Sequence, residues 1–193
     1  MYGGTFDPPH NAHLDIARTA LAHARLDRVV FVVAANPPHK PRGEITDAED
    51  RLAMVEAAIR EEPRFETSRL EIDRPGPSYT ADTLRQLGAY YNGAALFLIL
   101  GYDSLLDLPK WHAPRAILDR ARLLVIPRPG ETKPPPPVLE GEYEVLPFEE
   151  RDISSTEIRT RIEHGRPLDA LVPGAVRHVI ENRGLYGTKA GQS

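Results

Sequence analysis

Apolar residues follow two different spacings along the chain, one typical of buried strands and one typical of amphipathic helices. Three runs are apolar at every position: 29–33, 96–100 and 123–126. Such runs indicate strands that are covered on both faces of a parallel sheet. Between them, apolar residues recur at i, i+3 and i+7: Leu14, Ala17 and Leu21; Leu52, Val55 and Ile59; Leu84, Leu87 and Tyr91. This spacing predicts three helices and hence an α/β fold, with a doubly wound, Rossmann-like parallel sheet that has helices on both faces.

A stretch rich in proline follows the last of these strands. Six prolines lie between residues 127 and 137, and proline can neither continue a helix nor donate a hydrogen bond to a sheet. We therefore expect a proline-rich surface loop over 127–143.

Two further helices are expected near the C-terminus, over 154–186. Ser154 and Glu157 have the spacing of a capping box, which starts a helix. Pro173 and Gly184 mark the start and the end of the second helix. Together the two helices would form a small C-terminal helical subdomain. The expected organisation is a single domain over 1–186 and a flexible tail over 187–193.

Composition and charge restrict the class of protein. A chain of 193 residues that is 41% hydrophobic and 27% charged fits one globular domain. The sequence has no cysteine, which excludes disulfides, thiolate metal sites and cysteine nucleophiles and fits the cytoplasm. It has neither an apolar run long enough for a membrane span nor a signal-peptide pattern, so we expect no membrane partner. A net charge of -4 without a basic block speaks against a nucleic-acid partner.

A segment near the N-terminus places glycines and histidines around an expected helix start. Gly3 and Gly4 would let a phosphate approach the backbone, while the helix that begins near Asn11 points its unpaired N–H groups at the same spot. His10 and His13 are three positions apart and can share one face of that helix. Their imidazoles would offer donors to a polyphosphate.

Two other interpretations of this segment stay open. The glycines, with Pro8 and Pro9, would by themselves make a stiff turn. Alternatively, Asp7, His10 and His13 would bind a metal ion in a hydrolase, since carboxylates and imidazoles are common ligands. Nothing nearby in the sequence supplies the rest of a metal's ligand shell.

The histidine pair and a second motif resemble the nucleotidylyl transferase superfamily. That superfamily has H-x-G-H or T-x-G-H at the start of the first helix, where residues 10–13 of this chain read H-N-A-H. Its second motif is I-S-S-T-x-I-R, which residues 153–159 match at every position. A helix start with hydroxyl groups, followed by a guanidinium group one turn later, suits the outer phosphates of ATP.

The resemblance implies which residues hold ATP and act on it. The implied catalytic residues are His10, His13, Lys40 and Arg159. The implied ATP-binding residues are Gly3, Gly4, Thr5, Phe6, His10, His13, Gly101, Asp103, Ile153, Ser154, Ser155 and Arg159. No protein-held metal is expected, and Mg²⁺ would accompany ATP as the cofactor.

Across nearly the whole chain, three further stretches are similar to the bacterial nicotinate mononucleotide adenylyltransferases: 36–40, 77–84 and 101–111. The resemblance implies that the backbone near Thr80 faces the nicotinate carboxylate, that Trp111 stacks on the pyridine ring, and that Asp103 holds the ribose or phosphate region. The implied mononucleotide-binding residues are Asp7, Lys40, Tyr79, Thr80, Asp103 and Trp111. ATP and nicotinate mononucleotide are therefore the expected small-molecule partners.

The chain departs from the family pattern in three places. Ala12 stands where glycine is usual, and alanine is compatible with a helix, so we expect the fold to be kept. Only Met1 and Tyr2 precede the glycines, whereas a strand usually has about 5 to 6 residues, so we expect a shortened first strand. Tyr102 stands where family members often have a smaller or polar residue, which affects the shape of the pocket.

The reaction that the resemblance implies needs no catalytic base. The nucleophile is the 5′-phosphate of the mononucleotide, whose second pKa is about 6, so it is largely deprotonated at neutral pH. The protein must hold this phosphate in line with the α-phosphorus of ATP and stabilise the charge that develops on pyrophosphate. Histidines, helix starts, Lys40 and Arg159 can do both.

Three alternative functions stay open. Phosphopantetheine adenylyltransferase shares both superfamily motifs, although the loop 36–40 and Trp111 favour a pyridine mononucleotide. A metal-dependent phosphohydrolase built on Asp7, the histidines and Asp103 would release inorganic phosphate without a second nucleotide. A nucleotide-sensing module would bind without turnover. The sequence also leaves open a homo-oligomer and the choice between acid and amide forms of the pyridine ring.

Overall fold

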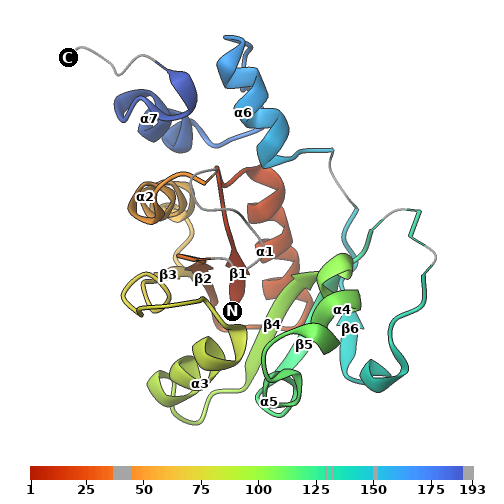
Figure 1. The fold of residues 1–193 in the computed structure, drawn as a ribbon. Coiled ribbons are helices and arrows are strands. Elements are labelled where there is room, and N and C mark those ends of the chain that lie inside the picture. The colour runs from red at the N-terminus through yellow and green to blue at the C-terminus, as the bar shows by residue number, and fades with distance from the viewer. Residues whose placement is uncertain (37–44, 129, 132, 150–151, 189–193) are drawn as a thin grey trace.

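The computed structural model describes residues 1–36, 45–128, 130–131, 133–149 and 152–188. In these ranges six strands form one sheet in the order β3-β2-β1-β4-β5-β6, and all neighbouring strands are parallel (Figure 1). The strands are β1 (Tyr2–Gly4), β2 (Val29–Val33), β3 (Phe65–Ser68), β4 (Leu96–Gly101), β5 (Ala121–Ile126) and β6 (Tyr143–Val145). The α-helices are α1 (Asn11–His23), α2 (Ala48–Ile59), α3 (Thr80–Tyr90), α4 (Tyr102–Asp107), α5 (Pro114–Leu118), α6 (Ser155–Glu163) and α7 (Gly174–Asn182), with 3-10 turns at Leu108–Lys110, Pro137–Leu139 and Leu185–Gly187.

The doubly wound parallel sheet predicted from the sequence is confirmed, and so are most of its elements. The three apolar runs lie in β2, β4 and β5, and the three amphipathic stripes lie in α1, α2 and α3. The two edge strands, β3 and β6, were not predicted, because edge strands are partly exposed and show no continuous apolar run. The helices α4 and α5 were also missed, since five or six residues are too few to show a helical period.

The short strand β1 lies at the centre of the sheet. Tyr2 pairs with Phe31 of β2 on one side and with Ile99 of β4 on the other. From β1 the chain builds the sheet outward through β2 and β3, and then returns to build it in the other direction from β4 to β6. In such sheets the ligand lies beyond the carboxyl ends of the strands at this reversal. The ends of β1 and β4, at Gly4 and Gly101, therefore mark the candidate site.

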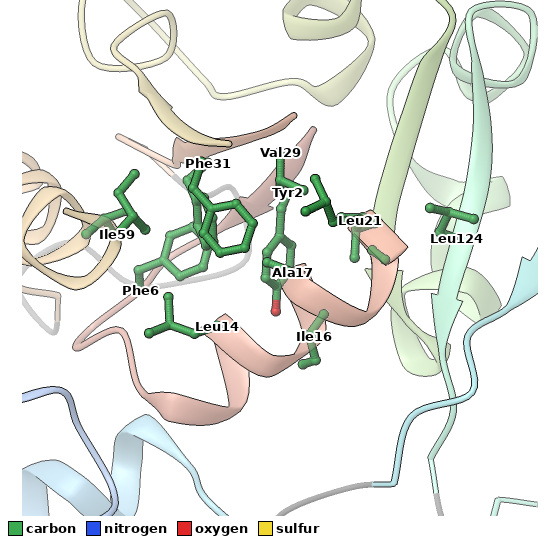
Figure 2. Packing of buried hydrophobic residues seen from close by; sticks show 14 of the residues in the cluster. Tyr2, Phe6, Leu14, Ile16, Ala17, Leu21, Val29, Phe31, Ile59 and Leu124 are labelled. Atoms are coloured by element: carbon green, nitrogen blue, oxygen red, sulfur yellow. The ribbon is translucent and has the colours of Figure 1, made fainter. Parts of the chain in front are cut away.

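Helices cover the sheet on both faces. On one face, α1 and α2 contribute to a core in which the rings of Tyr2, Phe6 and Phe31 gather between the strands and α1 (Figure 2). On the other face, Leu84 of α3 and Ile117 of α5 are fully buried with residues of β4 and β5. The predicted two-sided covering is therefore present.

The C-terminal helices pack on α2 rather than on the sheet (Figure 1). Met54 of α2 is fully buried in a cluster with Ile158 of α6 and Val176 of α7. As predicted, Ser154 caps the first of these helices, and its Oγ accepts the backbone N–H of Glu157 at 3.2 Å. This cluster fixes the start of α6 beside the sheet.

The expected proline-rich loop 127–143 contributes to the core. Leu139, in its 3-10 turn, is 1% exposed and belongs to the same cluster as Leu84.

Of the expected tail, residues 189–193 lie outside the described residues, and the expected domain limits stay predictions. Throughout the described ranges, no helix combines the length and the apolar composition needed to cross a membrane.

Candidate active site

The turn after β1 is shaped by packing as well as by its glycines. Phe6 has a left-handed backbone conformation, with φ of 51°, and its ring is 3% exposed. The ring packs edge-on against Tyr2 at a centroid distance of 5.5 Å. A Cβ atom on Gly4 would lie 2.8 Å from this ring, so glycine is needed here to make room for Phe6. Of the predicted ATP-binding residues, Phe6 thus has its side chain in the core.

The two predicted histidines lie together at the start of α1. Their rings stack with centroids 3.6 Å apart. The backbone N–H of His10 donates to Nδ1 of His13 at 3.2 Å, so in neutral His13 the proton is on Nε2. Burial lowers the pKa of His10 to about 4, and burial together with neighbouring His10 lowers the pKa of His13 well below its ordinary value. Both imidazoles are therefore neutral near pH 7, and His13 Nε2–H is a donor.

His10 has an unused polar atom. Its side chain is 6% exposed, and its buried Nδ1 has no hydrogen-bond partner within the described part of the chain. Buried polar atoms without a partner are uncommon in folded proteins and often lie where a ligand binds.

The second motif is bonded directly to the turn that leads to these histidines. Ser155 Oγ donates to the carbonyl oxygen of Pro8 at 2.9 Å. Arg159 Nη1 donates to the carbonyl oxygen of Asp7 at 2.8 Å, and its Nη2 donates to Thr156 Oγ1 at 3.3 Å. The starts of α1 and α6 therefore lie beside each other (Figure 1). We call the segment 7–13 together with 153–159 the phosphate corner.

Asp7 is held inside the protein at this corner. It is 4% exposed; its Oδ1 accepts the Tyr186 hydroxyl at 2.6 Å and its Oδ2 accepts the Thr46 N–H at 3.3 Å. Burial and the hydrogen bond to Asp7 raise the pKa of Tyr186. The predicted contact between Asp7 and the mononucleotide would compete with these bonds and stays a prediction.

A buried arginine, Arg51 of α2, also supports the turn. It is 1% exposed and donates to the carbonyl oxygens of Thr5 at 2.8 Å, Ala34 at 2.9 Å and Thr46 at 2.7 Å. Thr5 follows β1 and Ala34 follows β2, so Arg51 fixes the ends of two neighbouring strands. Sequence reasoning missed both Arg51 and Tyr186, because no spacing links them to residues so far away in the chain.

A cavity of about 490 Å³ opens at the carboxyl ends of β1 and β4. Six predicted site residues line it: Gly3, Gly4, Tyr79, Thr80, Gly101 and Trp111. Further lining residues, which were not among the predicted site residues, include Glu71, Ser78, Ser104, Lys110 and His112. The rings of Tyr79 and His112 stack at a centroid distance of 4.4 Å. With Trp111, they give the cavity aromatic walls.

The loop after β2 meets the start of α3 at this cavity. The backbone N–H of Asn36 donates to Ser78 Oγ, and the backbone N–H of Ser78 donates to the Asn36 carbonyl oxygen, both at 3.3 Å. Lys40, a predicted catalytic and mononucleotide-binding residue, lies outside the described residues. The structure thus places the beginning of its loop beside the cavity.

Three other residues that the sequence analysis named, Asp103, Tyr102 and Ile153, do not line the cavity. Asp103, in the first turn of α4, forms an ion pair with Arg128, which follows β5. Tyr102 donates its hydroxyl to the carbonyl oxygen of Lys133 at 2.9 Å. Ile153 is partly buried beside the core of the C-terminal helices.

The described residues offer little to a protein-held metal. Among them, no three His, Cys, Asp or Glu side chains come together as a metal site. The candidate ligands of a metal hydrolase are engaged otherwise: Asp7 accepts Tyr186, and His13 Nδ1 accepts the His10 N–H. The geometry therefore favours the polyphosphate interpretation of the N-terminal segment.

The chain is similar to known proteins over almost its full length. A family model described as cytidylyltransferase-like matches residues 1–161. The chain is 38% identical over 187 residues to the nicotinate-nucleotide adenylyltransferase of Bacillus subtilis, covering 96% of each chain. It is 45% identical over 188 residues to a Thermus thermophilus protein named "Probable nicotinate-nucleotide adenylyltransferase", covering 96% of this chain and 97% of the relative.

A solved structure has the same fold. It is the Plasmodium falciparum nicotinic acid mononucleotide adenylyltransferase complexed with NaAD, with a TM-score of 0.79 over 97% of this chain and 96% of that one. The two sequences are 19% identical, so this likeness concerns the fold alone.

Proposed function

The chain belongs to the cytidylyltransferase-like family and, within it, to the nicotinate-nucleotide adenylyltransferases, and on that basis we propose that its site transfers the adenylyl group of ATP to nicotinate mononucleotide. The products are nicotinate adenine dinucleotide, a precursor of NAD, and pyrophosphate. One observation supports the proposal above all others: the cavity is lined by Gly4 at the end of β1, and the same turn leads within three residues from Gly4 to Asp7, where the phosphate corner begins. Two nucleotides bound there would have their phosphates next to each other.

ATP binds with its phosphates at the phosphate corner. The starts of α1 and α6 lie side by side there, so the positive ends of two helix dipoles meet. Neutral His10 and His13 can stabilise phosphate charge by hydrogen bonds without the mutual repulsion of two imidazolium ions. Arg159, fixed by its bond to the Asp7 carbonyl, contributes the positive charge for the leaving pyrophosphate.

Nicotinate mononucleotide occupies the cavity. Its ring stacks on Trp111, its carboxylate meets the backbone at the start of α3 near Thr80, and Asp103 holds the ribose or phosphate region. Lys40 completes the set of residues that act on the two phosphates. The roles of Trp111 and Thr80 rest on the resemblance and on their places in the cavity wall, and those of Asp103 and Lys40 rest on the resemblance alone.

The protein's part in the reaction is positioning and charge stabilisation. The attacking 5′-phosphate has a second pKa of about 6 and needs no base near pH 7. The histidine pair lies where the two phosphates meet and stabilises the charge that grows as the bond to pyrophosphate breaks. Burial lowers the pKa of His10 and His13 in the free protein, so both rings are uncharged near pH 7 before the nucleotides bind.

A divalent cation fits this site as a companion of ATP. Because the described residues form no cluster of ligands that could hold a metal ion, the phosphates themselves would supply most of its ligands. We propose Mg²⁺, which screens the repulsion between the two anions. ATP and pyridine mononucleotides are made inside cells, so the proposal places the reaction in the cytoplasm.

The direct test is to incubate the purified protein with ATP, Mg²⁺ and nicotinate mononucleotide, and to measure dinucleotide and pyrophosphate together. We expect the two products in equal amounts. Parallel reactions with nicotinamide mononucleotide and with phosphopantetheine establish which acceptor is used. Release of inorganic phosphate without dinucleotide would replace this proposal with a phosphohydrolase.

A further inference from the structure

One wall of the cavity holds a buried acidic side chain to which the proposed reaction assigns no role. Glu71, in the segment between β3 and α3, lines the cavity and is 5% exposed. Its Oε1 accepts the Thr83 hydroxyl at 2.7 Å, and its carboxylate also accepts a hydrogen bond from the Ser78 side chain. Glu71 is thus held firmly at the cavity surface by the first turn of α3.

The surrounding protein does not fully balance the charge of this carboxylate. Arg74 Nη2 donates to the Thr83 hydroxyl at 3.1 Å, and the same hydroxyl donates to Glu71. The positive charge of Arg74 is therefore separated from the Glu71 carboxylate by the Thr83 hydroxyl group. Burial nevertheless raises the pKa of Glu71, and the hydrogen bonds and Arg74 only partly oppose this effect. Lys110, which also lines the cavity, donates from Nζ to Asp107 at 2.7 Å. A positive charge inside the cavity would therefore stabilise the Glu71 carboxylate.

The other walls favour the same kind of ligand. Trp111 lines the cavity, and the rings of Tyr79 and His112 stack beside it. Aromatic faces attract a flat cation through their quadrupole. A pyridine ring that carries a ribose on its nitrogen has this positive charge in the ring, even where a carboxylate on the ring balances it as in nicotinate mononucleotide, whereas phosphopantetheine has no positive charge to offer.

We propose that Glu71 is a specificity-determining residue that selects an acceptor with a positively charged ring. The inference rests on the function proposed above and names the property by which that acceptor is recognised. Inside a cavity with little water, the attraction between the carboxylate and the ring is stronger than in bulk solvent. Glu71 therefore discriminates by charge, while Trp111 discriminates by shape.

The test compares two acceptors that differ only in the charge of the ring. One is nicotinate mononucleotide, and the other is its C-riboside analogue, in which a benzoate ring of the same shape carries no positive charge. We expect the wild-type protein to prefer the charged ring in kcat/KM and in binding by at least about tenfold. Glu71→Gln keeps a side-chain oxygen that can accept the hydrogen bond from Thr83. The variant should lose most of the preference for the charged ring, because the KM for the charged acceptor alone should rise.

Two control variants separate charge from structure. Asp82→Asn removes an acidic side chain from the same first turn of α3, where Asp82 pairs with Arg85 at 3.6 Å and does not line the cavity. We expect it to keep the wild-type preference. Thr83→Val removes a hydrogen bond to Glu71 but leaves the charge of the Glu71 carboxylate. The variant should therefore change kcat/KM for both acceptors by the same factor.

The outcomes also distinguish this inference from the proposed function. Two results would overturn the role of Glu71 and leave the proposed function standing. One is dinucleotide formation by the wild-type protein with no preference for the charged ring. The other is an equal fall in kcat/KM for both acceptors in Glu71→Gln. Calorimetric binding of both acceptors to the wild-type protein measures the same preference without any variant. If the wild-type protein forms no dinucleotide from nicotinate mononucleotide, the function and the inference both fail.

Discussion

The phosphate corner follows the end of β1, which lines the cavity, but different interactions hold the two regions together. In the corner, Ser155, Arg159 and Tyr186 donate to residues that precede them by 147, 152 and 179 positions. The links around the cavity are more local, such as the bond between Glu71 and Thr83, 12 positions apart, and stacked aromatic rings. The corner therefore depends on the C-terminal helices, whereas the cavity depends on the ends of β1 and β4, the start of α3 and the segment around Trp111.

This difference suggests a division of labour. The corner contains buried polar groups with fixed partners, which suits a charge-stabilising role that is the same for any acceptor. The cavity has side chains such as Glu71 that are bonded only to residues within 12 positions in the chain, which suits the selection of one acceptor. Changes in the corner should lower kcat and stability, and changes in the cavity should raise the KM for the mononucleotide.

The largest expected effect is that of His10→Ala. We propose that this imidazole stabilises charge in the transition state, so its loss should lower kcat by about 10²- to 10³-fold. The KM values should change far less. His23→Ala, at the other end of α1, is the matched control, because His23 pairs with Glu144 away from the site. A defect confined to the KM for the mononucleotide would contradict the separation of the two regions.

A smaller effect, in a different kinetic constant, is expected for Trp111→Ala. Loss of the stacking surface should raise the KM for the mononucleotide by about 10- to 30-fold, with little change in kcat. Steady-state kinetics with each substrate varied in turn measures this. Trp111→Phe keeps an aromatic face and should recover most of the affinity. An equal rise in the KM for ATP would place Trp111 in both regions.

The features that the sequence predicted are those with a local signature. Continuous apolar runs revealed the inner strands, and Ser154 and Glu157 revealed a helix start. The motif residues Gly4 and Trp111 were found as parts of contiguous patterns, and the cavity has both in its walls. Local spacing was sufficient because each of these features is determined by residues close together in the chain.

The features that the sequence could not predict depend on the packed fold. The contact of Tyr186 with Asp7, and those of Arg51 with two strand ends, arise only when distant segments meet. Glu71 was missed because an isolated acidic residue gives no sign of burial in a cavity wall. Phe6 shows the reverse case: its motif suggested a contact with ATP, but its ring fills the core beside Gly4.

Tyr186→Phe tests how far the corner depends on the complete fold. The change leaves the buried carboxylate of Asp7 without its closest partner, so the free energy of unfolding should fall by about 1.5 to 3 kcal/mol. Urea denaturation measures the effect. Tyr90→Phe is the control, since Tyr90 is 78% exposed and its change should leave stability as it is. An unchanged midpoint in Tyr186→Phe would show that the corner is held by Ser155 and Arg159 without the C-terminal segment.

The smallest expected effect is a dependence of stability on pH that arises in the corner. Burial lowers the pKa of His10 from 6.5 to about 4 in the folded protein. Above pH 6.5 the ring is neutral in both states, and its full contribution to stability is present. As the pH falls from 6.5 toward 4, the unfolded chain binds a proton that the folded protein does not, so the free energy of unfolding decreases. At pH 5.5 the loss from His10 is about 1 to 1.5 kcal/mol.

Urea midpoints at pH 7.5 and pH 5.5 measure this loss. His13, whose pKa is also lowered by burial, adds a loss of the same sign. His10→Asn should be less sensitive to acid than the wild-type protein, whereas His178→Asn, on the exposed surface of α7, should keep the wild-type loss. Equal losses in all three proteins would mean that water reaches the imidazole of His10 in the folded state. The corner would then be as open as the cavity, and the contrast between the two regions would rest on their hydrogen bonds alone.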